Sequence, residues 1–149
     1  MRLFIDGDAF PNLLKPILLR AIERLRIETF VVSNKKISLG TSKYITYTIV
    51  AQGADVADAA IAESVQEGDL VITADIPLAD SIVTKKAHAI DHRGQRFSAD
   101  NIKHYLAMRN LMESIRECGD ITKGPKPFSP KDAHAFANQL NAFLAKRCR

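Results

Sequence analysis

The sequence predicts a single α/β domain, built as a three-layer α/β/α sandwich with a mainly parallel central sheet. Short apolar segments typical of strands alternate with longer segments whose apolar residues recur every three or four positions. Two short segments, residues 3–5 and 70–72, are continuously apolar, as strands in the middle of a parallel sheet are. The length of 149 residues suits one domain, which we assign to residues 1–149.

The predicted strands are short runs that are rich in β-branched or aromatic residues and that end at turn residues. The first ends at Asp6-Gly7-Asp8, and the fourth ends at Ala74-Asp75. Strands are expected at residues 3–5, 27–32, 44–51, 70–73 and 87–90.

The predicted helices combine helical spacing of apolar residues with ordinary start and stop signals. Pro11 suits the first turn of a helix, and Gly68 stands where glycine commonly follows a helix end. Helices are expected at about residues 11–25, 55–66, 77–86 and 100–116, and from residue 129 onward. The helices after about residue 99 are expected to pack on the sheet core.

Composition excludes several classes of protein. The chain is 46% hydrophobic, yet no segment reaches the roughly 20 apolar residues that a membrane span needs. The apolar run at the N-terminus is too short for a signal peptide, so we expect a cytoplasmic protein without membrane contact. Cys118 and Cys148 lack the spacing of a zinc site. The net charge of +4 favours anionic partners, RNA or other nucleic acid among them, and nothing in the sequence indicates an oligomeric state.

Aspartates follow two of the predicted strands. Asp6 and Asp8 follow the first strand, and Asp75 follows the fourth. Ligands of open α/β sheets bind at the carboxyl ends of the strands, so these carboxylates converge if the two strands are neighbours. Asp58, on the helix before the fourth strand, is expected to lean over the same crevice.

Several carboxylates in one crevice repel one another, and a divalent cation with a preference for oxygen ligands relieves that repulsion. We therefore expect a site for Mg²⁺ or Mn²⁺. Its candidate ligands are Asp6, Asp8, Asp58, Asp75 and Asp80. Asp55, one turn before Asp58, and the hydroxyl of Thr73 are expected to support it. For each aspartate the alternative is ordinary turn, cap or surface chemistry.

Three segments, residues 4–11, 53–58 and 69–79, resemble the YaiI/YqxD family of uncharacterised bacterial proteins, also called UPF0178. Shorter similar stretches extend the resemblance over nearly the whole chain. The family usually carries Cys where this chain has Phe10, so a thiol-based role is not available there. We expect Phe10 to pack against the sheet.

The resemblance implies a PIN-like domain, a fold of metal-dependent nucleases. PIN-like domains place an Asp after the first strand, Asp-x-x-Ile on a later helix and Thr-x-Asp after the next strand. The matching residues here are Asp6, Asp58-Ala59-Ala60-Ile61 and Thr73-Ala74-Asp75. The resemblance thus implies catalytic roles for Asp6, Asp58 and Asp75. A further acid usually follows within a few residues, where this chain has Pro77, which leaves Asp80 as a looser substitute.

Together these features predict a metal-dependent nuclease that hydrolyses phosphodiester bonds, with RNA as the expected substrate. Four basic residues in predicted loops are candidates for phosphate contacts: Lys35, Lys36, Arg93 and Arg96. One alternative is a domain that binds RNA or a nucleotide without cleaving it. Another is a phosphatase of the haloacid dehalogenase type, which also has Asp-x-Asp after its first strand. Phe10 and the position of Gly68-Asp69 before the fourth strand disfavour that reading.

Overall fold

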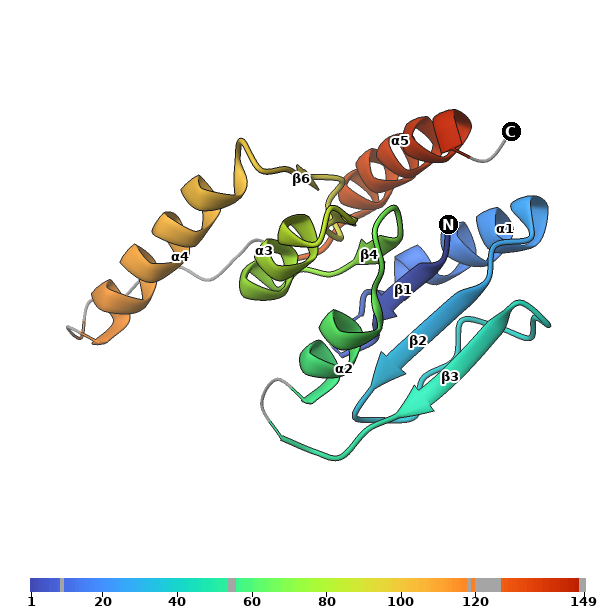
Figure 1. Cartoon of the computed structure of the whole chain (residues 1–149), viewed down its shortest axis with the longest axis horizontal. Coiled ribbons are helices and arrows are strands. Elements are labelled where there is room, and N and C mark those ends of the chain that lie inside the picture. The colour runs from blue at the N-terminus through green and yellow to red at the C-terminus, as the bar shows by residue number, and fades with distance from the viewer. Residues whose placement is uncertain (9, 54–55, 118, 120–126, 148–149) are drawn as a thin grey trace.

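The computed structural model describes residues 1–8, 10–53, 56–117, 119 and 127–147. Within these ranges the strands form one sheet in the order β3-β2-β1-β4-β5-β6 (Figure 1). Neighbouring strands are parallel except β5 and β6, which are antiparallel. The strands are β1 (Leu3–Asp6), β2 (Thr29–Ser33), β3 (Ile45–Ile49), β4 (Leu70–Ile72), β5 (His88–Ile90) and β6 (Arg96–Phe97). The first strand therefore lies inside the sheet, beside the fourth.

Helices cover both faces of the sheet, which confirms the predicted three-layer α/β/α arrangement. Helices α1 (Lys15–Leu25) and α5 (Pro130–Arg147) pack on one face. Helices α2 (Val56–Ser64) and α3 (Ile76–Thr84) pack on the other. A short 3₁₀ turn, Asn12–Leu14, follows Pro11, so α1 begins a few residues later than the sequence predicts.

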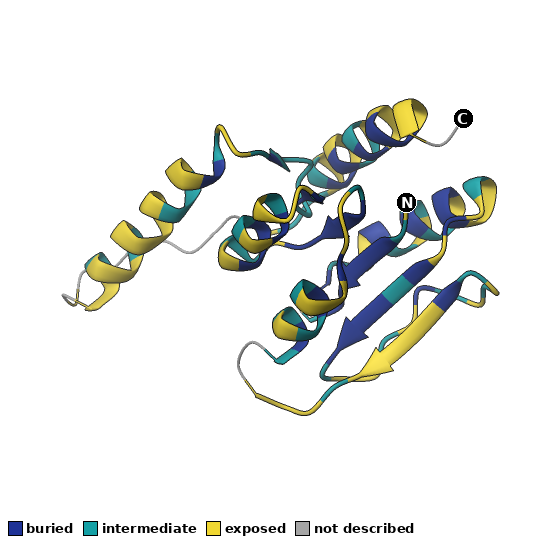
Figure 2. Cartoon of the chain, viewed as in Figure 1, coloured by how far each residue is buried: buried dark blue, intermediate teal, exposed yellow. Residues whose placement is uncertain are grey.

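The central strands are apolar throughout because both of their faces are buried. Leu3 and Ile5 of β1 pack in the core beneath α1 and α5, whereas Phe4 packs beneath α2 and α3. In β4, Ile72 and Val71 divide between the two cores in the same way. Figure 2 shows β1 and β2 largely buried and the edge strand β3 largely exposed. The alternation of β1 and β4 side chains between the two cores follows from the period of two along a strand.

The two C-terminal helices differ in their packing. Helix α5 lays Phe136, Leu140 and other apolar residues into the core, as expected. Helix α4 (Ile102–Glu117) leaves the sheet after its first turn and runs outward past α3 (Figure 1). Ile102 is the one buried residue of α4, and Leu111 is 54% exposed. The apolar periodicity of this helix therefore does not place it on the sheet core.

The strand β6 was not expected from the sequence, which placed Arg93 and Arg96 in a loop. Arg96 and Phe97 pair with Ile90 and Ala89 instead. A two-residue strand is too short to produce a periodic signal. Among the helices of the described ranges, none is long and apolar enough to cross a membrane.

Candidate functional site

The carboxylate of Asp6 lies at the carboxyl end of β1, and its residue is only 8% exposed. Its Oδ2 accepts a hydrogen bond of 3.1 Å from the hydroxyl of Thr73, the residue directly after β4. Its Oδ1 accepts the backbone N–H of Asp8 at 3.3 Å. The pairing of β1 with β4 brings these chain segments together, as the sequence analysis required.

Thr73 also links Asp6 to Asp75. The hydroxyl oxygen of Thr73, which is fully buried, accepts the backbone N–H of Asp75 at 3.0 Å. The carboxylate of Asp75 in turn accepts the N–H of Leu78 at 2.9 Å and caps α3. The cap interpretation of Asp75 is therefore correct, but one of its oxygens is enough for that task.

Asp58 completes the group from the first turn of α2. Its carboxyl group interacts with those of Asp75 and Asp6. Burial raises the pKa of Asp58 to about 8, and the hydrogen bond and negative charge of Asp75 add to the rise. Burial also raises the pKa of Asp6, against the opposing hydrogen bonds from Asp8 and Thr73. Asp58 thus lies beside both Asp6 and Asp75, and burial disfavours the ionised forms of Asp58 and Asp6.

The other predicted acidic residues are placed differently. The carboxylate of Asp8 accepts the backbone N–H of Asn34 at 2.9 Å and so fixes the loop that follows β2. Asp80 forms an ion pair of 3.2 Å with Lys103 of α4. Asp55 lies outside the described residues. The structure therefore brings Asp6, Asp58 and Asp75 together with Thr73, sets Asp8 beside Asp6, and directs Asp80 toward α4.

The geometry of this group and the chemistry of its donors bear differently on metal binding. In the part of the chain that the structure describes, no three or more His, Cys, Asp or Glu side chains are placed so that they could hold a metal ion. Carboxylate oxygens are nevertheless the donors that Mg²⁺ and Mn²⁺ prefer, and the disfavoured ionised forms of Asp6 and Asp58 would gain from a nearby cation. Metal binding would require these side chains to turn toward a common point.

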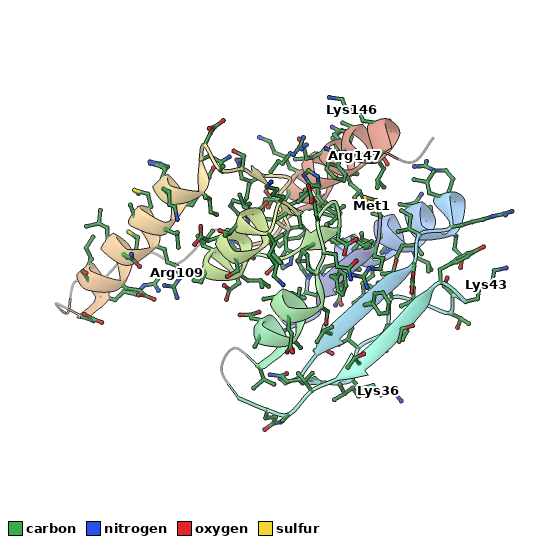
Figure 3. The ribbon with its side chains drawn as sticks, viewed as in Figure 1. Met1, Lys36, Lys43, Arg109, Lys146 and Arg147 are labelled. Carbon is green, nitrogen blue, oxygen red and sulfur yellow. The ribbon has the colours of Figure 1, made fainter. Side chains whose placement is uncertain are left out.

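A basic hollow of about 380 Å³ adjoins this group on the side of Asp8. Its walls include the predicted phosphate ligands Lys35 and Lys36, and Figure 3 shows Lys36 extending from this loop. Lys15, at the start of α1, lines the same hollow. Sequence reasoning missed Lys15 because nothing in the linear pattern indicates that α1 begins beside the loop after β2.

The two other predicted phosphate ligands are engaged by the C-terminal helix and the segment before it. The guanidinium of Arg93 pairs with Asp132 of α5 and lies over the ring of Phe128, 5.6 Å from its centre. The guanidinium of Arg96 lies 5.1 Å from the ring centre of Phe143. These contacts give both arginines a structural role.

Phe10 packs as expected. It is buried in the core beneath α1 and α5, and its ring meets His92 edge-on at 5.3 Å between centroids. The loop after β1 is thereby held against the loop after β5.

Comparisons with known proteins confirm the family resemblance of the sequence. The profile of the family described as "Uncharacterized BCR, YaiI/YqxD family" matches residues 4–146. A UPF0178 protein of Sulfurimonas denitrificans is 73% identical over 98% of this chain and 97% of its own length. A UPF0178 protein of a Sulfurovum species is 70% identical over 99% of this chain and 100% of its own. One from Dechloromonas aromatica is 49% identical over 98% and 97%, respectively. No solved structure matches the chain significantly.

Proposed function

The chain belongs to the YaiI/YqxD family, and on that premise we propose that it is a Mg²⁺- or Mn²⁺-dependent nuclease that hydrolyses phosphodiester bonds in RNA. One observation carries the proposal: at the carboxyl edge of the sheet, the carboxyl group of Asp58 on α2 interacts with those of Asp6 on β1 and Asp75 at the start of α3. Binding sites of open α/β sheets occur at this edge. The PIN-like resemblance implies the same three aspartates.

Some residues of the site would bind the cation, and others orient those ligands. Asp6, Asp58 and Asp75 would hold the cation, which when bound neutralises charge on the attacked phosphate and makes water a better nucleophile. Thr73 fixes Asp6 by donating its hydroxyl hydrogen. The cap on α3 fixes Asp75. Oriented ligands of this kind are what a catalytic metal site needs from the residues around it.

The basic hollow supports a polyanionic substrate. Lys15, Lys35 and Lys36 line it, and Asp8 stands between it and Asp6. A nucleic-acid strand whose phosphates contact these lysines would pass beside the three aspartates. Binding through such contacts releases counterions from the nucleic acid and therefore weakens as salt rises.

Two alternatives make different use of the same residues. A domain that only binds RNA or a nucleotide would need the lysines and not the carboxylates, and the lack of a preformed metal group among the described side chains favours it.

A haloacid-dehalogenase-type phosphatase is disfavoured by Asp69. Its carboxylate accepts hydrogen bonds from Arg2 and Gln66 before β4 begins, at the opposite edge from Asp6.

The test is cleavage of labelled RNA and single-stranded DNA in the presence of Mn²⁺. Wild type is compared with Asp6→Asn and Asp75→Asn, and Asp100→Asn serves as the control because Asp100 is exposed before α4. We expect both site variants to lose activity and Asp100→Asn to keep it. Activity that persists undiminished in both site variants would come from a contaminant and would contradict the proposal. RNA binding without cleavage of any substrate would support the binding domain instead.

A further inference from the structure

A second hollow, of about 270 Å³, adjoins Asp58 and Asp75 and shares no lining residue with the basic hollow. It lies between α2, α3 and α4, and Asp58 and Asp75 form part of its wall. Across from them stands Arg109 of α4, whose side chain extends toward α3 (Figure 3). A cationic side chain thus faces two of the proposed metal ligands across an open space.

The lining of this hollow leaves room for a ligand. Ala59, Ala62 and Ser81 contribute small side chains to the walls between the aspartates and Arg109. Helix α4 leaves the sheet core after its first turn, so Arg109 reaches the hollow from a helix that stands apart from the core. The outward course of α4 therefore forms the wall of this hollow that carries Arg109.

Arg109 is available to an anion. Its guanidinium pairs with Glu113 at 3.1 Å, and both side chains are largely exposed, at 41% and 48%. An exposed ion pair between residues four apart on a helix is weak. A phosphate group can accept two parallel hydrogen bonds from the guanidinium of Arg109, so it competes well with the exposed carboxylate of Glu113.

We propose that Arg109 binds a substrate phosphate next to the one that is cleaved. This inference rests on the proposed function and deepens it: the substrate is a strand with several phosphates, held by Arg109 in the hollow beside Asp58 and Asp75 and by the lysines of the basic hollow. Arg109 is then a positioning residue, since it contacts a part of the substrate that does not react. A substrate with a single phosphate gains nothing from it.

The binding test uses a short fluorescein-labelled oligouridylate in EDTA, so that neither metal nor cleavage enters the result. Arg109→Gln should weaken binding about five- to tenfold and lower the slope of log affinity against log salt by about 0.7, the value for one phosphate contact on a single strand. Arg109→Lys should keep part of the affinity, because it retains the charge and loses the fork. Arg116→Gln is the matched control, with the same charge change on an exposed residue of the same helix.

The kinetic test separates positioning from a structural effect. With Mn²⁺ and RNA, Arg109→Gln should raise KM more than it lowers kcat, and Arg116→Gln should change neither. With bis(p-nitrophenyl) phosphate, which has one phosphate, Arg109→Gln and wild type should be equal. A loss on both substrates would overturn the positioning role.

Two further results would overturn the inference: equal affinity of Arg109→Gln and Arg116→Gln for the oligouridylate, or no binding by wild type. Failure of the proposed function looks different. In that case wild type cleaves nothing, while the binding measurement in EDTA still decides whether Arg109 contacts a phosphate.

Discussion

The hydroxyl of Thr73 donates a 3.1 Å hydrogen bond to the carboxylate of Asp6, a residue 67 positions away in the sequence. The same hydroxyl accepts the backbone N–H of Asp75. One buried side chain therefore ties together the ends of β1 and β4 and the start of α3. This link explains how Asp6, at the end of β1, and Asp75, at the start of α3, are both positioned by the residue that follows β4.

Thr73→Val keeps the shape of the side chain and removes the hydroxyl. Asp6 then loses a hydrogen-bond donor and the N–H of Asp75 loses its acceptor, so we expect the free energy of unfolding to fall by about 1–3 kcal/mol. Urea denaturation measures this change. Thr84→Val is the control, because the exposed Thr84 hydroxyl donates to the carbonyl of Asp80 within its own helix and does not link separate elements. Equal stability of the two variants would show that the Thr73 link has no energetic weight.

Lys35 and Lys36 are expected to bind substrate phosphates from the basic hollow. The double variant Lys35→Gln/Lys36→Gln should bind RNA more weakly and lower the salt slope of binding by about 1.4, or about 0.7 for each contact. Fluorescence anisotropy at several salt concentrations measures both quantities.

The control for that variant is Lys43→Gln/Lys146→Gln, which removes the same charge from two exposed lysines that line neither hollow and lie apart from Lys36 (Figure 3). Similar salt slopes for the two double variants would mean that RNA affinity depends only on the net charge of the protein and not on contacts in the basic hollow.

His92 makes the fold sensitive to acid. Burial lowers its pKa to about 4 from 6.5, and the charge of Arg93 adds to this effect. Its Nε2 is buried without a hydrogen-bond partner among the described atoms. Because the folded-state pKa lies below the unfolded one, the unfolded chain binds the proton first as pH falls. The contribution of His92 to stability is complete above pH 6.5 and is lost as the pH falls toward 4.

His92→Phe should therefore be more stable than wild type at pH 4.5 and differ much less at pH 8, with a change of up to about 3 kcal/mol between the two conditions. Urea denaturation at both pH values measures the difference between the proteins, in which the titration of other groups cancels. His104→Phe, at an exposed position on α4, is the control for the exchange of a histidine for a phenylalanine. An unchanged pH profile for His92→Phe would contradict the assignment.

Much of the fold follows from local sequence pattern. The continuous apolar character of β1 and β4 predicted strands with two buried faces, inside a parallel sheet. Their adjacency was a condition of the predicted site, and the structure meets it by pairing β1 with β4. Asp58 was predictable by position on the preceding helix and by the resemblance to PIN-like domains.

Other parts of the site depend on packing that the pattern does not encode. The apolar spacing of α4 resembles that of a core helix, but this helix runs past α3 with Leu111 exposed. Arg109 could not be assigned to the site without that course, although the stretch Ala107-Met108-Arg109 belongs to the family resemblance. Asp80 was chosen by its distance in sequence from Asp75, and its pairing with Lys103 depends on where α4 lies.

Calorimetric titration of Mn²⁺ into the protein tests most directly whether Asp6, Asp58 and Asp75 form a metal site. Wild type should bind Mn²⁺ saturably. Asp75→Asn should bind it far more weakly, because an amide oxygen replaces a charged ligand at the start of α3 while the cap on Leu78 remains possible. Asp100→Asn, with the same chemical change at an exposed position, should match wild type. Equal binding of Mn²⁺ by wild type and Asp75→Asn, or no binding by wild type, would contradict the metal site and with it the proposed nuclease.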